Sequence, residues 1–274
     1  MGDSAKKILF VSAEMEPYLP AGRMATLCRE LPQGIQERRK EIRAFMPRYG
    51  CINERKNQLH EVIRLSGMNI IIGDVDRPLV IKVASISAAR IPVYFIDNED
   101  YFRRKQLYRD EAGNFFPDNG ERAIFFARGV LETVKKLRWA PDVIHCSGWI
   151  SHVLPLYLKK AYKDDPIFAQ SKVVLSLYDD VADEKLSPGF AQTILFGGVK
   201  PRDIALSEPS DGTELAKLAV QYSDGIILGS PEVKPELKEY AASLDLPVLP
   251  YEEESFQDGS YLDRYNAFYD DLLK

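Results

Sequence analysis

Short apolar runs alternate along the chain with longer segments in which apolar residues recur at helical spacing. The apolar runs predict buried strands at 7–13, 41–50, 91–98, 141–148, 171–180 and 224–230. The amphipathic segments predict helices at 22–39 (bent near Pro32), 118–137, 150–162 and 211–223. Residues 57–88 combine β-branched runs with a Gly-Asp turn and predict a β-hairpin. This alternation indicates an α/β fold with a doubly wound parallel sheet.

The end of the chain has a different pattern from the rest. The run "PYEEESFQDGS" at 250–260 is polar and acidic, which is typical of a linker. In "YLDRYNAFYDDLLK" at 261–274, Tyr, Leu and Phe recur at helical spacing, which predicts a helix docked back on the body. We therefore expect one domain over 1–248, a linker over 249–260 and a C-terminal helix over 261–274.

Charge and composition exclude several classes of function. The 274 residues carry a formal charge of −5, which argues against nucleic acid as a partner. No apolar stretch approaches the ~20 residues that span a bilayer, so no membrane association is expected. The start "MGDSAKK" lacks the apolar core of a secretion signal, and the three cysteines suit a reducing cytoplasm. The three histidines and three cysteines show no metal-ligand spacing, so we expect neither a metal nor a cofactor.

The loop after the first predicted strand is the first candidate site. "PYLPAGRMATLCRELP" at 17–32 lies where many α/β enzymes hold a phosphorylated ligand. Such loops usually carry paired glycines and a cation, whereas this one has Gly22, with Pro20 two residues before it and Arg23 directly after it. Gly22 and Arg23 are therefore candidate substrate-binding residues in a loop that departs from the usual composition.

Six stretches in register, between about residues 7 and 235, resemble one family. They are "KILFVSAEMEPYLPAG", "LPQGIQERRKEIRAFMPRYG", "VYFIDNEDYFRRKQLY", "FPDNGERAIFFARGVLE", "LRWAPDVIHCSGW" and "PLYLKK". Together they resemble the N-terminal half of bacterial glycogen synthases and plant starch synthases. The resemblance implies a Rossmann-like half of a two-domain (GT-B) glucosyltransferase that uses a nucleotide-glucose donor. The second domain, which carries most donor contacts in that family, is expected to be missing from this chain.

The motifs that carry the family's chemistry are replaced in this sequence. Where the resemblance implies Lys-Thr-Gly-Gly-Leu, the chain has "PAGRM" at 20–24. Where it implies His-Asp-Trp-His, the chain has "SGWI" at 147–150, and Thr-(Val/Ile)-His-Asn is replaced by "SLYD" at 176–179. Losing one group that stabilises developing charge costs on the order of 10²–10³-fold in rate. We therefore expect no catalytic residues and no independent glucosyl transfer.

Several polar residues nevertheless remain candidates for substrate binding. Asp118, Asn119 and Arg122 could line the acceptor side of a cleft, or could instead cap a helix and form an ion pair. His145 and Trp149 lie near the end of one predicted strand, where indole can stack on a sugar and the histidine can equally be structural.

A further polar group follows a neighbouring strand. Tyr178, Asp179 and Asp180 could do acid–base work or hold a cation, or could simply form a turn.

Three functions are compatible with this pattern. The leading hypothesis is a glycogen synthase-like protein that acts by binding a glucan, a nucleotide-sugar such as ADP-glucose, or a protein partner. The alternative is a glucosyltransferase completed by a separately encoded donor domain or by oligomerisation. The third is a different small-molecule activity using Arg23 together with Tyr178, Asp179 and Asp180.

Overall fold

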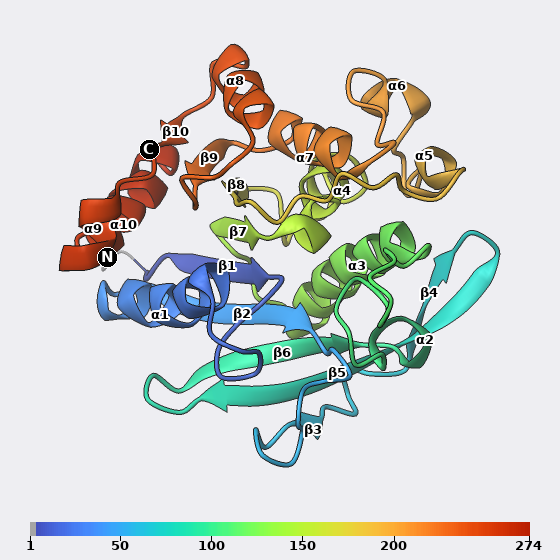
Figure 1. The fold of residues 1–274 in the computed structure, drawn as a ribbon. Coiled ribbons are helices and arrows are strands. Elements are labelled where there is room, and N and C mark those ends of the chain that lie inside the picture. Colours follow the sequence, from blue (N-terminus) through green and yellow to red (C-terminus); the bar gives the residue numbers. More distant parts are fainter. Residues whose placement is uncertain (1–3) are drawn as a thin grey trace.

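The apolar runs of the sequence form the strands of one sheet, in a computed structural model that describes residues 4–274 (Figure 1). The strand order is β10-β9-β8-β7-β1-β2-β6-β5-β3, and β4 pairs with β5 beside this path. The strands are β1 (Lys7–Ser12), β2 (Glu41–Pro47), β3 (His60–Glu61), β4 (Met68–Ile72), β5 (Val75–Ile86), β6 (Ile91–Asp97), β7 (Val143–Ser147), β8 (Lys172–Leu177), β9 (Gly225–Leu228) and β10 (Val248–Leu249).

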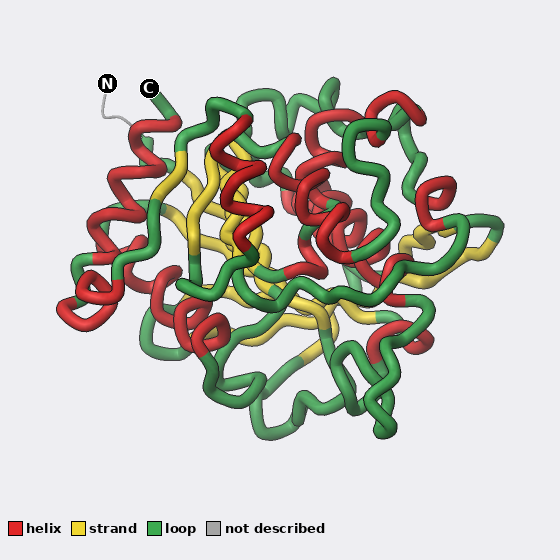
Figure 2. The backbone as a smooth tube through the Cα atoms, turned by 45° about the horizontal axis from the view of Figure 1, so that its top comes forward, coloured by secondary structure: helices red, strands yellow, loops and turns green. Residues whose placement is uncertain are grey.

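Helices lie on both sides of the strands (Figure 2). Their bounds are α1 (Arg23–Glu37), α2 (Glu99–Phe102), α3 (Asn119–Leu137), α4 (Leu154–Lys160), α5 (Phe190–Thr193), α6 (Pro201–Ile204), α7 (Gly212–Gln221), α8 (Pro235–Ser243), α9 (Glu253–Asp258) and α10 (Tyr261–Leu272), with a 3₁₀ turn η1 at Trp149–Ser151. Helix α1 packs against α10, whereas α3, α4, α7 and α8 pack in succession on one another. Burial of their apolar stripes against the strands forms one continuous core.

The predicted doubly wound α/β sheet is confirmed for seven strands, from β10 to β6, which run parallel. The remaining part is antiparallel, because β5 pairs with β6, β4 and β3 in opposite directions. The predicted hairpin over 57–88 is the β4–β5 pair. The predicted helix over 150–162 is shorter than expected, since η1 and a turn precede α4. Pro32 lies buried inside α1, which continues to Glu37.

The C-terminal segment closes the sheet face beside α1. Helix α10 docks as predicted, burying Tyr261, Tyr265 and Tyr269. The stretch 249–260, expected as a linker, contains the short helix α9 instead of extended chain throughout. Residues 1–3, which begin the predicted domain and the segment tested for a secretion signal, lie outside the described residues.

Candidate functional site

The loops that follow β1, β7 and β8 meet at the carboxyl edge of the sheet, as the parallel topology requires. The Ala13 N–H donates to the Ser147 carbonyl at 2.8 Å, and the Trp149 N–H donates to Asp180 Oδ2 at 2.7 Å. At this edge, the predicted site residues Arg23, Tyr178 and Asp179 line one cavity of about 440 Å³. The full lining of this first cavity is Glu14, Arg23, Met24, Tyr178, Asp179, Asp180 and Glu232.

The first cavity carries four carboxyl groups and a single guanidinium. That guanidinium belongs to Arg23, which donates a hydrogen bond to the Tyr251 hydroxyl, lies 5.3 Å over its ring and is 3.9 Å from Glu253. Burial raises the pKa of Glu14, because the charged carboxylate is poorly solvated there. Gly22 precedes α1 at its N-cap position, where a Cβ would meet no atom within 4 Å. The loop therefore presents an acidic surface, with its cation engaged by the C-terminal segment.

Gly148 stands at a tight position beside the Asp180 carboxyl group. Its backbone has φ of 91° and ψ of 151°, and a Cβ placed there would lie 2.3 Å from the Ala13 Cβ. The same Cβ would lie 3.3 Å from Asp180 Oδ2. The local backbone thus admits only glycine at 148, and the Asp180 carboxyl group lies beside it.

Asp180 is the most perturbed carboxyl group of the site. Burial raises its pKa from 3.8 to about 7, against the lowering effect of the Trp149 N–H. Its Oδ1 is buried and has no hydrogen-bond partner among the described residues. Next to it, Asp179 is exposed to solvent, while Tyr178 is buried with its ring against Gly229. Burial also raises the pKa of Tyr178, so its phenol stays protonated.

His145 is a structural residue inside the core. Its Nδ1 is 2.7 Å from the Tyr269 hydroxyl and its Nε2 is 2.6 Å from Ser176 Oγ. Burial lowers its pKa to about 3, so the imidazole is neutral at physiological pH. Both ring nitrogens are therefore occupied by protein groups, and the possible sugar contact of His145 receives no support.

The 118–122 group holds a loop rather than lining the first cavity. Asp118 forms no side-chain cap on α3 but accepts two hydrogen bonds from Arg104, at 2.7 and 2.5 Å. The buried Arg122 donates to Asn119 Oδ1 and to backbone carbonyls in the loop 101–108, to which Asn119 also donates. Of the structural roles open to this group, the ion pair is present, between Asp118 and Arg104, whereas the Asp118 side chain does not cap α3. These three side chains fix the 101–108 loop against α3.

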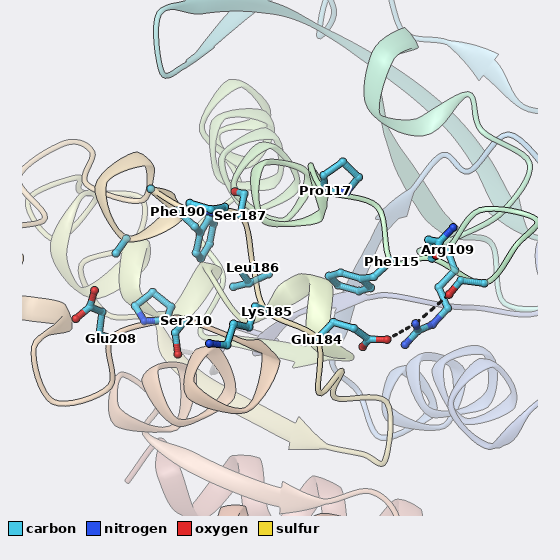
Figure 3. A pocket seen from close by; sticks show the side chains of 16 residues that line it. Arg109, Phe115, Pro117, Glu184, Lys185, Leu186, Ser187, Phe190, Glu208 and Ser210 are labelled. Atoms are coloured by element: carbon cyan, nitrogen blue, oxygen red, sulfur yellow. Dashed lines mark hydrogen bonds and ion pairs between the residues drawn. The ribbon is translucent and has the colours of Figure 1, made fainter.

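A larger cavity, of about 810 Å³, lies between the loop before α3 and the loop after β8 (Figure 3). Arg109 and Glu184 lie at one end and Glu208 at the other, with Phe115 and Phe190 between them (Figure 3). Its remaining lining residues are Gly113, Asn114, Pro117, Lys185, Leu186, Ser187, Pro188, Gly189, Ala191, Pro209 and Ser210. Sequence reasoning missed this cavity, because its residues come from three loop segments and the first turn of the short helix α5, none of which has a periodic pattern.

A smaller cavity of about 290 Å³ adjoins the larger one and connects it to the strand ends. The two share Arg109, Phe115 and Glu184, and the smaller one is also lined by Trp149 and Asp180. The ring of Trp149 is buried and packs edge-on against Tyr108 and tilted against Phe115. We call the two cavities together the groove. Of the predicted site residues, Trp149, Asp179 and Asp180 line it.

No cluster of three or more His, Cys, Asp or Glu side chains that could hold a metal occurs within residues 4–274. In the same range, none of the helices has both the length and the apolar character needed to cross a membrane.

The family follows from comparison with known proteins. The starch synthase catalytic domain model matches residues 7–247. The chain belongs to the starch synthase catalytic domain family. The predicted resemblance to glycogen and starch synthases is thereby confirmed.

Two glycogen synthases illustrate how far this family member matches its relatives. That of Chlorobium luteolum is 40% identical over 174 residues, which cover 63% of this chain and 36% of the relative. That of Chlorobaculum parvum is 32% identical over 232 residues, covering 84% of this chain and 47% of the relative. The chain thus spans less than half the length of these glycogen synthases.

The fold agrees with a solved starch synthase structure. The catalytic domain of Starch Synthase IV from Arabidopsis thaliana, bound to ADP and acarbose, matches with a TM-score of 0.70 and 16% identity. The match covers 92% of this chain and 52% of that one. At this identity the likeness concerns the Rossmann-like fold.

Proposed function

We propose that this glycogen synthase-like chain binds a neutral α-glucan in the groove and does not transfer glucose by itself. The proposal includes the predicted cytoplasmic location. It is supported by the chain's membership of the starch synthase catalytic domain family and by its glycogen synthase relatives. The solved starch synthase of the same fold was bound to acarbose as well as to ADP.

One observation carries the choice of a neutral ligand over a nucleotide-sugar. The first cavity, beside the loop where a diphosphate would be expected, holds four carboxyl groups against Arg23 alone. A diphosphate would place negative charge beside carboxyl groups whose own ionisation is already disfavoured, since the pKa values of Glu14 and Asp180 are raised. The larger cavity instead balances Arg109 and Lys185 with Glu184 and Glu208, so it suits an uncharged ligand.

The groove also offers the contacts that sugars need. The half-buried Phe115 supplies apolar ring surface for sugar C–H groups, while the buried Phe190 and Trp149 form the floor and the inner end of the groove. Glu184, Glu208 and Asn114 supply acceptors and donors for hydroxyl groups. A few polar groups in an otherwise apolar lining are typical of small-molecule sites.

Calorimetry with maltooligosaccharides from two to seven units, and separately with ADP-glucose, tests the proposal. We expect heat of binding with the longer glucans and weaker or no binding of ADP-glucose. Phe115→Ala should weaken glucan binding about tenfold, since truncating an aromatic anchor costs more than about 1 kcal/mol. Phe256→Ala is the matched control, because this half-buried ring lies on α9 away from the groove. Tighter binding of ADP-glucose than of any glucan would refute the proposal.

A second candidate is glucosyl transfer completed by a donor domain, supplied separately or by oligomerisation. Family membership favours it, because the matched relatives are named as glycogen synthases and are more than twice as long as the matched region. The assay is transfer of labelled glucose from ADP-glucose to glycogen, with the chain alone and with the C-terminal half of a relative added. Activity only in the mixture would support this candidate, while activity of the chain alone would refute our leading proposal. Binding of a separate protein partner would be revealed by complex formation in the same mixture.

A further inference from the structure

The groove is divided by an ion pair. Arg109 and Glu184 face each other at the end where the two cavities meet (Figure 3). The same guanidinium donates to the Gly113 carbonyl at 3.3 Å and lies 5.6 Å over the Phe115 ring. The three residues that line both cavities are therefore Arg109 and Glu184, which form the ion pair, and Phe115, whose ring lies beneath the Arg109 guanidinium.

The two sides of the pair differ in chemistry. The smaller cavity ends at Trp149 and Asp180, among carboxyl groups. The larger cavity is lined by Phe190 and Leu186 together with prolines. A short ligand can occupy either side without disturbing the pair, whereas a ligand that spans both must pass Arg109 and Glu184.

The pair is built so that its side chains can separate while the backbone stays in place. The two side chains are 45% and 38% exposed, and water screens an ion pair of this kind strongly. The backbone next to Glu184 is fixed, because Leu186 N–H donates to the Ser210 carbonyl at 2.9 Å and Lys185 forms a β-bridge with Asp211. On the other side, Arg109 forms a β-bridge with Phe115.

We propose that the Arg109–Glu184 pair sets the chain-length preference of the groove. When formed, it leaves two subsites that each take a short glucan. A longer glucan separates the pair, and the freed guanidinium and carboxylate then bond to sugar hydroxyl groups. This inference depends on the glucan binding proposed above.

The test measures the ratio of affinities for maltoheptaose and maltose by calorimetry. Glu184→Gln removes the charge of the pair and keeps an oxygen that can accept a hydrogen bond. The ratio of maltoheptaose to maltose affinity should therefore rise, by up to about fivefold. Glu99→Gln is the matched control, because Glu99 forms an exposed ion pair with Arg103 that lies outside the groove. This control should leave the ratio unchanged.

Salt dependence gives a second, independent readout. A neutral sugar has no charge to screen, so any rise of the ratio with NaCl reports on the protein's own ion pair. We expect that rise in the wild type and its loss in Glu184→Gln. An exchanged pair, Arg109→Glu with Glu184→Arg, should restore the wild-type ratio and its salt dependence.

The outcomes separate the two proposals. If the wild type binds glucans but Glu184→Gln and salt leave the ratio unchanged, the inference about the pair is wrong and the proposed function stands. If the wild type binds no maltooligosaccharide of any length, the proposed function fails, and the inference fails with it.

Discussion

Gly148 offers the sharpest test of the site geometry. In Gly148→Ala the new Cβ would lie 2.3 Å from the Ala13 Cβ, and the backbone would keep φ of 91° and ψ of 151°. Backbone strain in this glycine-only region costs about 1–3 kcal/mol, and overpacking a filled core costs about 1–3 kcal/mol more. Gly189→Ala is the matched control, because Gly189 also has φ of 90°, but a Cβ placed there would meet no atom within 4 Å beyond its chain neighbours. It should lose only about 1–2 kcal/mol.

Thermal unfolding followed by circular dichroism measures the difference. Since about 1 kcal/mol lowers the Tm of a chain of this size by roughly 2–4 °C, Gly148→Ala should unfold well below Gly189→Ala. Adding Ala13→Gly to Gly148→Ala removes the opposing methyl group and should recover the packing part of the loss. Equal losses of Tm in the two single variants, or no recovery of Tm in the double variant, would show that the loops after β1 and β7 do not approach each other as closely as described.

Two further predictions concern buried polar groups. Because burial raises the pKa of Asp180 from 3.8 to about 7, the folded chain holds a proton that the unfolded chain releases, so stability should fall as pH rises through this range. Asp180→Asn should lack this contribution in Tm profiles from about pH 4 to 8, and an unaltered profile would contradict it. Tyr269→Phe should cost about 1–3 kcal/mol in urea unfolding by leaving His145 Nδ1 unpaired. Tyr265→Phe, whose hydroxyl has no partner among the described residues, should cost nothing, and equal losses would refute the assignment.

The parallel half of the fold could be predicted because its strands are buried on both faces. Strand β1, for example, has four consecutive apolar residues, "ILFV", within "KILFVS" and is covered by helices on either side, so its pattern depends little on context. The edge elements carry weaker signals. Strand β3 consists of two exposed residues, and β10 pairs with β9 at only two positions. Neither has an apolar pattern of its own, so each is a strand only because of its pairing with the neighbouring strand. The α9 helix escaped prediction because its acidic residues also suit a linker.

Only those residues of the candidate site that directly follow a buried strand could be predicted from the sequence. The carboxyl group after β8 and the Trp149 indole follow buried strands, and the parallel topology brings them together. The groove is different, since Arg109 and Glu184 lie 75 positions apart in loops with no periodic pattern. The place of Phe190 in the groove could not be predicted either, because a single aromatic residue after a glycine is also typical of ordinary loop packing.

The docking of α10 has a consequence for how the chain is made. His145 in β7 gains its hydrogen-bond partner Tyr269 only after a further 124 residues have been synthesised. Until α10 has emerged from the ribosome, the sheet face beside α1 is uncovered and its apolar surface is open to wrong partners. A nascent chain stalled before residue 261 should therefore be a good substrate for holdase chaperones, and should lose that property once α10 is translated.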